Sequence, residues 1–84
     1  MSSEAKIKSD SSILLGENIK HFRQIREYSQ AYMVKELQLR GCKTTKQSYS
    51  KYEKDLAHIT ASEINAIAEI LGVQLEELFA KKSS

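Results

Sequence analysis

Apolar side chains recur at intervals of three and four residues along most of this chain, and this spacing restricts the fold more than any other feature. Such spacing places the apolar side chains on one face of a helix, which must then be buried against other helices. The absence of proline and the presence of only three glycines also disfavour a sheet with many turns. We therefore expect an all-α fold. The two clearest stripes are Leu15, Ile19, Phe22 and Ile25, and then Ile64, Ile67, Ala68 and Leu71.

Residues with a short side-chain oxygen precede several of these helices and are expected to cap them. Ser29 and Thr45 are good N-cap residues, and Thr60 followed by Glu63 forms a capping box. Gly72 is expected to end the fourth helix. The expected helices cover about residues 13–27, 30–38, 45–54, the segment between Thr60 and Gly72, and a short stretch from 75 to about 81–82, with a loop over residues 39–44.

The length of 84 residues leaves room for one hydrophobic core. Residues 1–12 are polar and rich in serine, so we expect a flexible N-terminal arm. Residues 13–80 form the expected folded domain, and residues 81–84 a C-terminal tail. Leu56 and Ile59 are expected to attach the loop after the third helix to the core. In the fifth helix, we expect Leu75 and Leu78 to belong to the core and not to an interface with another protein copy.

Charge is distributed unevenly, although the net charge is only +2. Residues 1–60 hold eleven basic and seven acidic residues, whereas residues 61–84 hold two and four. No acidic residue lies between Leu37 and Tyr52, a stretch that contains Arg40, Lys43, Lys46 and Lys51. A local basic patch of this kind suits a polyanion, and an ordinary solvated face is the alternative.

The third expected helix has two different faces. One face carries Tyr49, Tyr52 and Glu53, with the tyrosines expected to fill core space and to keep their hydroxyl groups at the rim. The other face carries Lys46, Gln47, Ser50 and Lys51. Lysine can donate to guanine acceptors and glutamine can pair with adenine, so this face has the donors needed to contact base edges. A solvated helix face would have the same composition.

Several functional classes find no support in the sequence. No apolar run is long enough for a membrane span, and the first residues do not resemble a signal peptide. The single cysteine, Cys42, fits a reducing cytoplasm; it is either a redox-sensitive thiol beside Arg40 and Lys43 or a loop residue without a role. His21 and His58 do not suggest a metal site, and we expect no cofactor and no enzyme activity.

Four segments together resemble the Cro/phage-repressor (XRE-like) helix-turn-helix DNA-binding family. They are LGENIKHFRQIREYSQ, KTTKQSYSKYEKD, ASEINAIAEILGV and LEELF, in the order of the family and over about four fifths of the chain. The resemblance implies a compact five-helix bundle of the lambda-repressor-like type. The domain expected over residues 13–80 is then a helix-turn-helix DNA-binding domain.

The resemblance also implies roles for individual residues. The base-contacting positions of the recognition helix fall on Lys46, Gln47 and Lys51. Arg23 and Glu53 match a structural ion pair that joins the first and third helices. The positions that contact the DNA backbone fall on Gln30, Thr45, Ser48 and Lys54.

The chain departs from the family pattern at the turn between the second and third helices. After Leu37 the segment QLRGCKTT makes this turn about five residues longer than usual. The lengthened turn brings Arg40 and Lys43 toward the expected DNA-facing edge, where they would add contacts to phosphates. The pair Lys54–Asp55 also lacks the glycine that is often found there.

The sequence therefore predicts a sequence-specific, double-stranded DNA-binding transcriptional regulator, most simply a repressor that occupies its operator. One recognition helix contacts few base pairs, so we expect a homodimer on a palindromic operator, with no small-molecule ligand. Phe79 in the fifth helix belongs either to the core or to the dimer interface. The alternative is a protein-interaction module on a helix-turn-helix scaffold, such as an antitoxin-type component. We expect a cytoplasmic protein that associates with the nucleoid through DNA.

Overall fold

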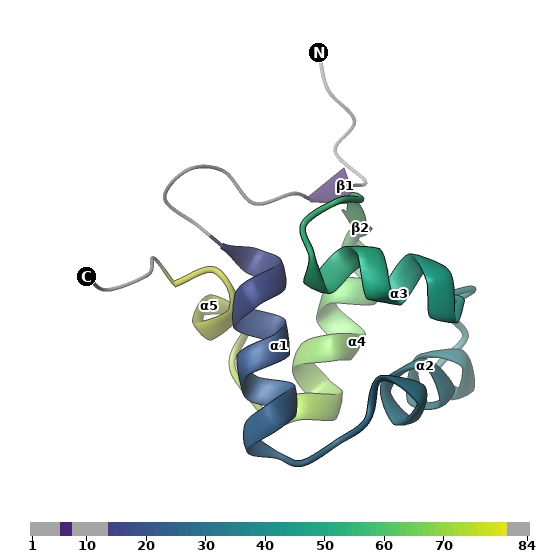
Figure 1. Cartoon of the computed structure of the whole chain (residues 1–84), viewed down its shortest axis with the longest axis horizontal. Helices are drawn as coiled ribbons and strands as arrows, with labels where there is room; N and C mark the ends of the chain where they lie inside the picture. Colours follow the sequence, from purple (N-terminus) through teal and green to yellow (C-terminus); the bar gives the residue numbers. More distant parts are fainter. Residues whose placement is uncertain (1–5, 8–13, 81–84) are drawn as a thin grey trace.

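The computed structural model describes residues 6–7 and 14–80. In this part of the chain five helices surround one core (Figure 1). The predicted all-α, five-helix architecture is confirmed. The helices are α1 (Leu15–Ile25), α2 (Gln30–Leu39), α3 (Lys46–Glu53), α4 (Ala61–Leu71) and α5 (Leu75–Leu78).

Two short strands, each two residues long, accompany the helices. Strand β1 (Lys6–Ile7) pairs antiparallel with β2 (Ile59–Thr60), so that Lys6 lies opposite Thr60 and Ile7 opposite Ile59. Strand β1 belongs to the segment that was expected to be a flexible arm. The rest of that segment, and the expected tail over residues 81–84, lie outside the described residues.

The core is formed by the apolar stripes that the spacing predicted. Helix α1 packs against α3, α4 and α5, and α2 packs against α3 and α4. Phe22 only partly enters the core, and Ile25 at the end of α1 is exposed. The largest side chains that are fully enclosed are those of Leu15, Ile19, Met33, Leu37, Tyr49, Ile59, Ile64, Ile67, Leu71 and Leu78.

The first four helices end in the same way, with a left-handed residue that directs the chain away from the helix axis. These residues are Glu27, Gly41, Asp55 and Gly72, with φ between 58° and 89°. In each case the next N–H donates to the carbonyl five residues earlier, as in a Schellman motif. The four bonds, from Tyr28 to Arg23, Cys42 to Leu37, Leu56 to Lys51 and Val73 to Ala68, measure 2.9–3.1 Å. Only Gly72 was predicted to have this role.

Besides Ile25, two other apolar residues that were expected in the core are not buried. Leu56 does not attach a loop to the core, because the left-handed turn at Asp55 directs it outward and leaves it 68% exposed. Leu75 is likewise partly exposed, at 38%. Leu78 and Ile59 are buried as expected.

Helix α5 is shorter than predicted. It ends at Leu78 rather than near residues 81–82. The Asn18 side chain of α1 donates to the carbonyl of Leu78 at 2.9 Å and to that of Ala80 at 3.0 Å. These carbonyls are therefore satisfied by α1, and the helix needs no further turn.

Candidate nucleic-acid interface

Helix α3 presents a polar face to solvent because its other face is tightly held. Tyr49 and Tyr52 are in the core, as predicted, but their hydroxyl groups are buried and do not lie at the rim. The Tyr49 hydroxyl donates to Glu53 Oε2 at 2.6 Å, and the Tyr52 hydroxyl donates to both oxygens of Glu63 at 2.9 Å. The buried tyrosines fix the rotation of the helix about its own axis.

The exposed face of α3 brings together the three predicted base-contacting residues. Lys46, Gln47 and Lys51 are exposed, and so is Lys54, which follows the helix. Together with Ser50 and Leu56 they line one shallow groove along the helix. The groove therefore combines three ammonium groups, one amide and one hydroxyl, which is a set of donors suited to phosphates and base edges.

The N-terminus of α3 is capped by Thr45 and Ser48, the two hydroxyl residues that were assigned to DNA backbone contacts. Thr45 is the N-cap, as predicted, and its side-chain oxygen accepts the Ser48 N–H at 3.1 Å. The Ser48 hydroxyl in turn accepts the Thr45 N–H at 3.0 Å. This capping box fixes the start of the helix at the side from which Lys46 and Gln47 project.

Glu53 is the centre of a buried network beneath the polar face. Arg23 Nε donates to Glu53 Oε2 at 2.6 Å and Arg23 Nη2 to Oε1 at 3.1 Å, so the expected ion pair is present and bidentate. The carboxylate raises the pKa of Arg23, and burial together with the hydrogen bond to Glu53 raises the pKa of Tyr49. Removing either charged partner alone would leave a buried charge, at a cost of about 3–5 kcal/mol.

Gln30 belongs to the same network. Its Nε2 donates to Glu53 Oε1 at 3.0 Å, so the side chain at the start of α2 is tied to the end of α3. An amide nitrogen has two hydrogens, and this bond uses one of them. Glu53 thus holds α1, α2 and α3 in one arrangement.

The lengthened turn between α2 and α3 is anchored at its far end. Thr44 is buried, and its hydroxyl donates to Glu63 Oε2 at 2.6 Å. The Gln38 side chain donates to the Thr44 carbonyl at 2.8 Å. Residues 40–43 therefore lie in a loop whose two ends are fixed.

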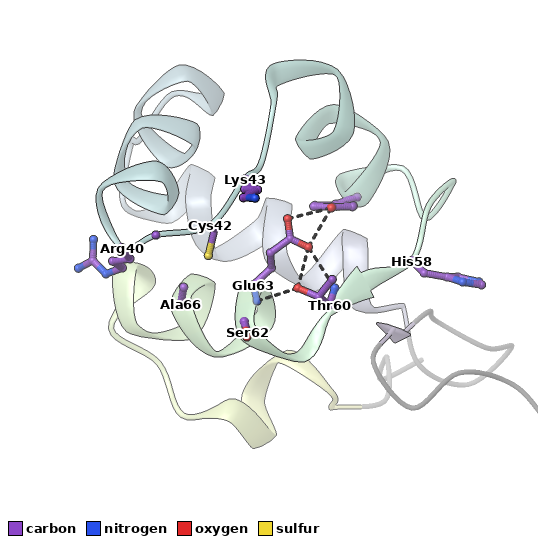
Figure 2. Close-up of a pocket in the computed structure, with 10 residues that line it drawn as sticks. Arg40, Cys42, Lys43, His58, Thr60, Ser62, Glu63 and Ala66 are labelled. Carbon is purple, nitrogen blue, oxygen red and sulfur yellow. Dashed lines mark hydrogen bonds between the residues drawn. The ribbon is translucent and has the colours of Figure 1, made fainter.

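Arg40 and Lys43 do not share the groove of α3. They line a second pocket, between the turn and the first turns of α4, together with Cys42, His58 and Ser62 (Figure 2). The Arg40 guanidinium donates to Glu36 at 2.7 Å and to Glu69 at 2.9 Å, and these two bonds raise its pKa. Lys43 is exposed.

Cys42 does not have the environment of a reactive thiol. It is half-buried beneath the turn, with its side chain directed toward α4 (Figure 2). Burial, and to a lesser extent the nearby Glu63, raises the pKa of its thiol, and Arg40 opposes this effect. Burial thus outweighs the effect of the basic neighbour, and the thiol form is favoured, which disfavours the interpretation of Cys42 as a redox-sensitive residue.

The importance of Glu63 goes beyond the capping box that the sequence indicated. Besides Thr44 and Tyr52, its carboxylate accepts the N–H and the hydroxyl of Thr60, each at 3.0 Å (Figure 2). Burial acts to raise its pKa, but the hydrogen bonds from Thr44, Thr60 and Tyr52 outweigh burial and lower it. The spacing of Thr60 and Glu63 predicted the hydrogen bonds between these two residues. Nothing in the sequence indicated that Thr44 and Tyr52 also donate to Glu63.

A family model described as a helix-turn-helix domain matches residues 16–84. The chain therefore belongs to this helix-turn-helix family, which agrees with the resemblance to the Cro/phage-repressor type. Searches of curated proteins and of solved structures gave no significant match. Within the described part of the chain, no helix is both long enough and apolar enough to cross a membrane.

Proposed function

We propose that this protein is a sequence-specific regulator of transcription that binds double-stranded DNA and represses by occupying its operator. The observation that carries the proposal is the polar face of α3, where Lys46, Gln47 and Lys51 line one groove above a buried Tyr49–Glu53 layer. A rigid helix with exposed donors is what the major groove can accommodate. The membership in a helix-turn-helix family agrees with this function.

Contacts with the DNA backbone would flank this helix. Lys54 at its end and Thr45 and Ser48 at its start would contact phosphates on either side of the groove. Gln30, with the amide hydrogen that Glu53 does not use, would donate to a phosphate from the start of α2.

The lengthened turn would contribute unequally to backbone contacts. Lys43 is exposed and would add a phosphate contact. Arg40 was assigned the same role from the sequence, but its guanidinium already donates to Glu36 and Glu69. We therefore assign the phosphate contact of this turn to Lys43.

A homodimer on a palindromic operator would supply the specificity that one helix lacks. The partly exposed Leu75 on α5 and the half-buried Phe79, which follows this helix, are apolar groups available for such an interface. Two copies related by a two-fold axis would place their recognition helices one helical turn of DNA apart. The protein would then act in the cytoplasm, on DNA, with no cofactor.

Selection of bound sequences from a random pool of duplex DNA tests the proposal directly. We expect an enriched motif with two-fold symmetry and half-sites about 10 base pairs apart. Enrichment of an asymmetric motif would contradict the dimer and leave specific binding intact. If no motif emerges, the specific-binding proposal fails and a protein-interaction module becomes the better explanation.

Gln47→Ala tests the assignment of the base-contacting face. We expect the variant to bind the selected operator more weakly by about 1–3 kcal/mol and to lose preference at one base pair, because the amide makes a bidentate contact. Gln24→Ala removes an exposed glutamine of α1 and is the matched control. Equal losses on operator and random DNA, measured by fluorescence anisotropy, would contradict the base contact.

A further inference from the structure

Leu56 is an exposed leucine in an unusual place. It is 68% exposed, and it lines the same groove as Lys46, Gln47, Ser50, Lys51 and Lys54. A single exposed leucine on a protein surface needs no explanation. One that lies within the proposed base-contacting groove, among three lysines, raises the question of what it would contact there.

The position of Leu56 is fixed by the backbone. The Leu56 N–H donates to the Lys51 carbonyl at 2.9 Å, which closes the end of α3. The preceding residue, Asp55, has a left-handed φ of 58°, and its carboxylate accepts the Gly16 N–H of α1 at 2.9 Å. The turn that presents Leu56 is thus attached both to α3 and to α1, so the side chain is held out toward solvent in a defined direction.

The residues around Leu56 indicate which class of molecule it would contact. Lys46, Lys51 and Lys54 give the groove a positive charge, which suits a polyanion and opposes an ordinary apolar protein surface. A DNA major groove offers one apolar group on its base edges, the 5-methyl of thymine. Duplex DNA therefore matches both the charge of the groove and its apolar residue.

We propose that Leu56 is a specificity-determining residue that contacts the 5-methyl group of a thymine in each half-site. This inference rests on the proposed function and adds a fourth residue to the base-contacting set Lys46, Gln47 and Lys51. It predicts a preference for thymine that no hydrogen bond of the protein explains.

The test uses deoxyuridine, which lacks only the 5-methyl group of thymine. Each thymine of the selected operator is replaced in turn, and the dissociation constants of wild type and Leu56→Ala are measured by fluorescence anisotropy. At one position per half-site the replacement should weaken wild type about fourfold, the factor expected for one buried methyl group. Leu56→Ala should bind the thymine operator and the operator with deoxyuridine at that position with equal dissociation constants.

Leu39→Ala is the matched control, because Leu39 is 71% exposed and belongs to α2, outside the groove. It should show the same deoxyuridine effect as wild type. If wild type and Leu56→Ala respond identically at every thymine, the contact is excluded while specific DNA binding stands. If wild type selects no DNA sequence at all, the proposed function fails and the contact fails with it.

Discussion

Gly16 lies where α1 packs directly against the end of α3. A Cβ atom at this position would lie 2.2 Å from the Tyr52 carbonyl oxygen and 2.9 Å from the Asp55 carboxylate. The Gly16 N–H also donates to Asp55, so the same residue provides both the close approach and the hydrogen bond. The residue with no side chain thus lets α1 and the end of α3 meet at backbone distance.

Gly16→Ala should lower the free energy of unfolding by about 3 kcal/mol, because the new methyl group forces the two helices apart. Urea denaturation measures the loss. Gly41→Ala is the control: its φ of 89° is left-handed but no heavy atom lies within 4 Å, so the cost should be about 1 kcal/mol. A loss for Gly16→Ala no larger than that for Gly41→Ala would mean that α1 and the end of α3 shift to admit the methyl group, so that the close contact with the Tyr52 carbonyl is not what requires glycine.

At the level of single residues, local patterns could be predicted and distant contacts could not. Ser29, Thr45 and Thr60 cap helices as expected, because each cap binds an N–H three residues away. The partners of Asp55 lie far along the chain, since Gly16 is 39 positions away. Leu56 was assigned to the core because it is apolar, and only the fold shows that it is exposed.

The turn between α2 and α3, over residues 40–45, is the element whose length was expected to differ from the family pattern. Its ends are nevertheless fixed, at Gly41 by the Schellman bond of Cys42 to Leu37 and at Thr44 by the bond to Glu63. Both ends of the turn are therefore held, and α3 is still capped by Thr45. Helix α3 can keep its position because the extra residues precede Thr44, whose bond to Glu63 holds the start of this helix.

Glu63→Gln tests this anchor through the dependence of stability on pH. The pKa of Glu63 is lowered in the folded state, so its stabilisation is complete above the unfolded value of about 4.3 and is lost as the pH falls through the folded pKa. The variant should be less stable than wild type at pH 7, and its stability should fall less steeply on acidification below about pH 5. Urea denaturation at a series of pH values measures both effects.

Glu76→Gln, which changes an exposed carboxylate on α5, is the control for the loss of one charge. It should leave the acid slope close to that of wild type. Parallel slopes for wild type and Glu63→Gln would mean that the hydrogen bonds from Thr44, Thr60 and Tyr52 do not favour the ionised carboxylate.

Across the whole molecule, charge is distributed unevenly among the helices. The lysines of the candidate interface lie on and just after α3, whereas Glu69, Glu76 and Glu77 lie on α4 and α5. In Figure 1 α3 and α5 lie on opposite sides of α1. A net charge of +2 therefore conceals a basic α3 and an acidic α5, and a polyanion would approach the molecule from the side of α3.

The same distribution predicts which basic residues contribute to the salt dependence of DNA binding. A phosphate contact releases counterions, so Lys54→Ala should reduce the slope of log K against log salt concentration by about 0.9 for each bound protomer. Arg40→Ala should leave the slope unchanged, because its guanidinium is already bound to Glu36 and Glu69. Lys20→Ala removes a positive charge from α1 and controls for net charge alone. A loss for Arg40→Ala as large as that for Lys54→Ala would mean that Arg40 exchanges its carboxylate partners for phosphate, which would place the lengthened turn at the DNA backbone through Arg40 as well as Lys43.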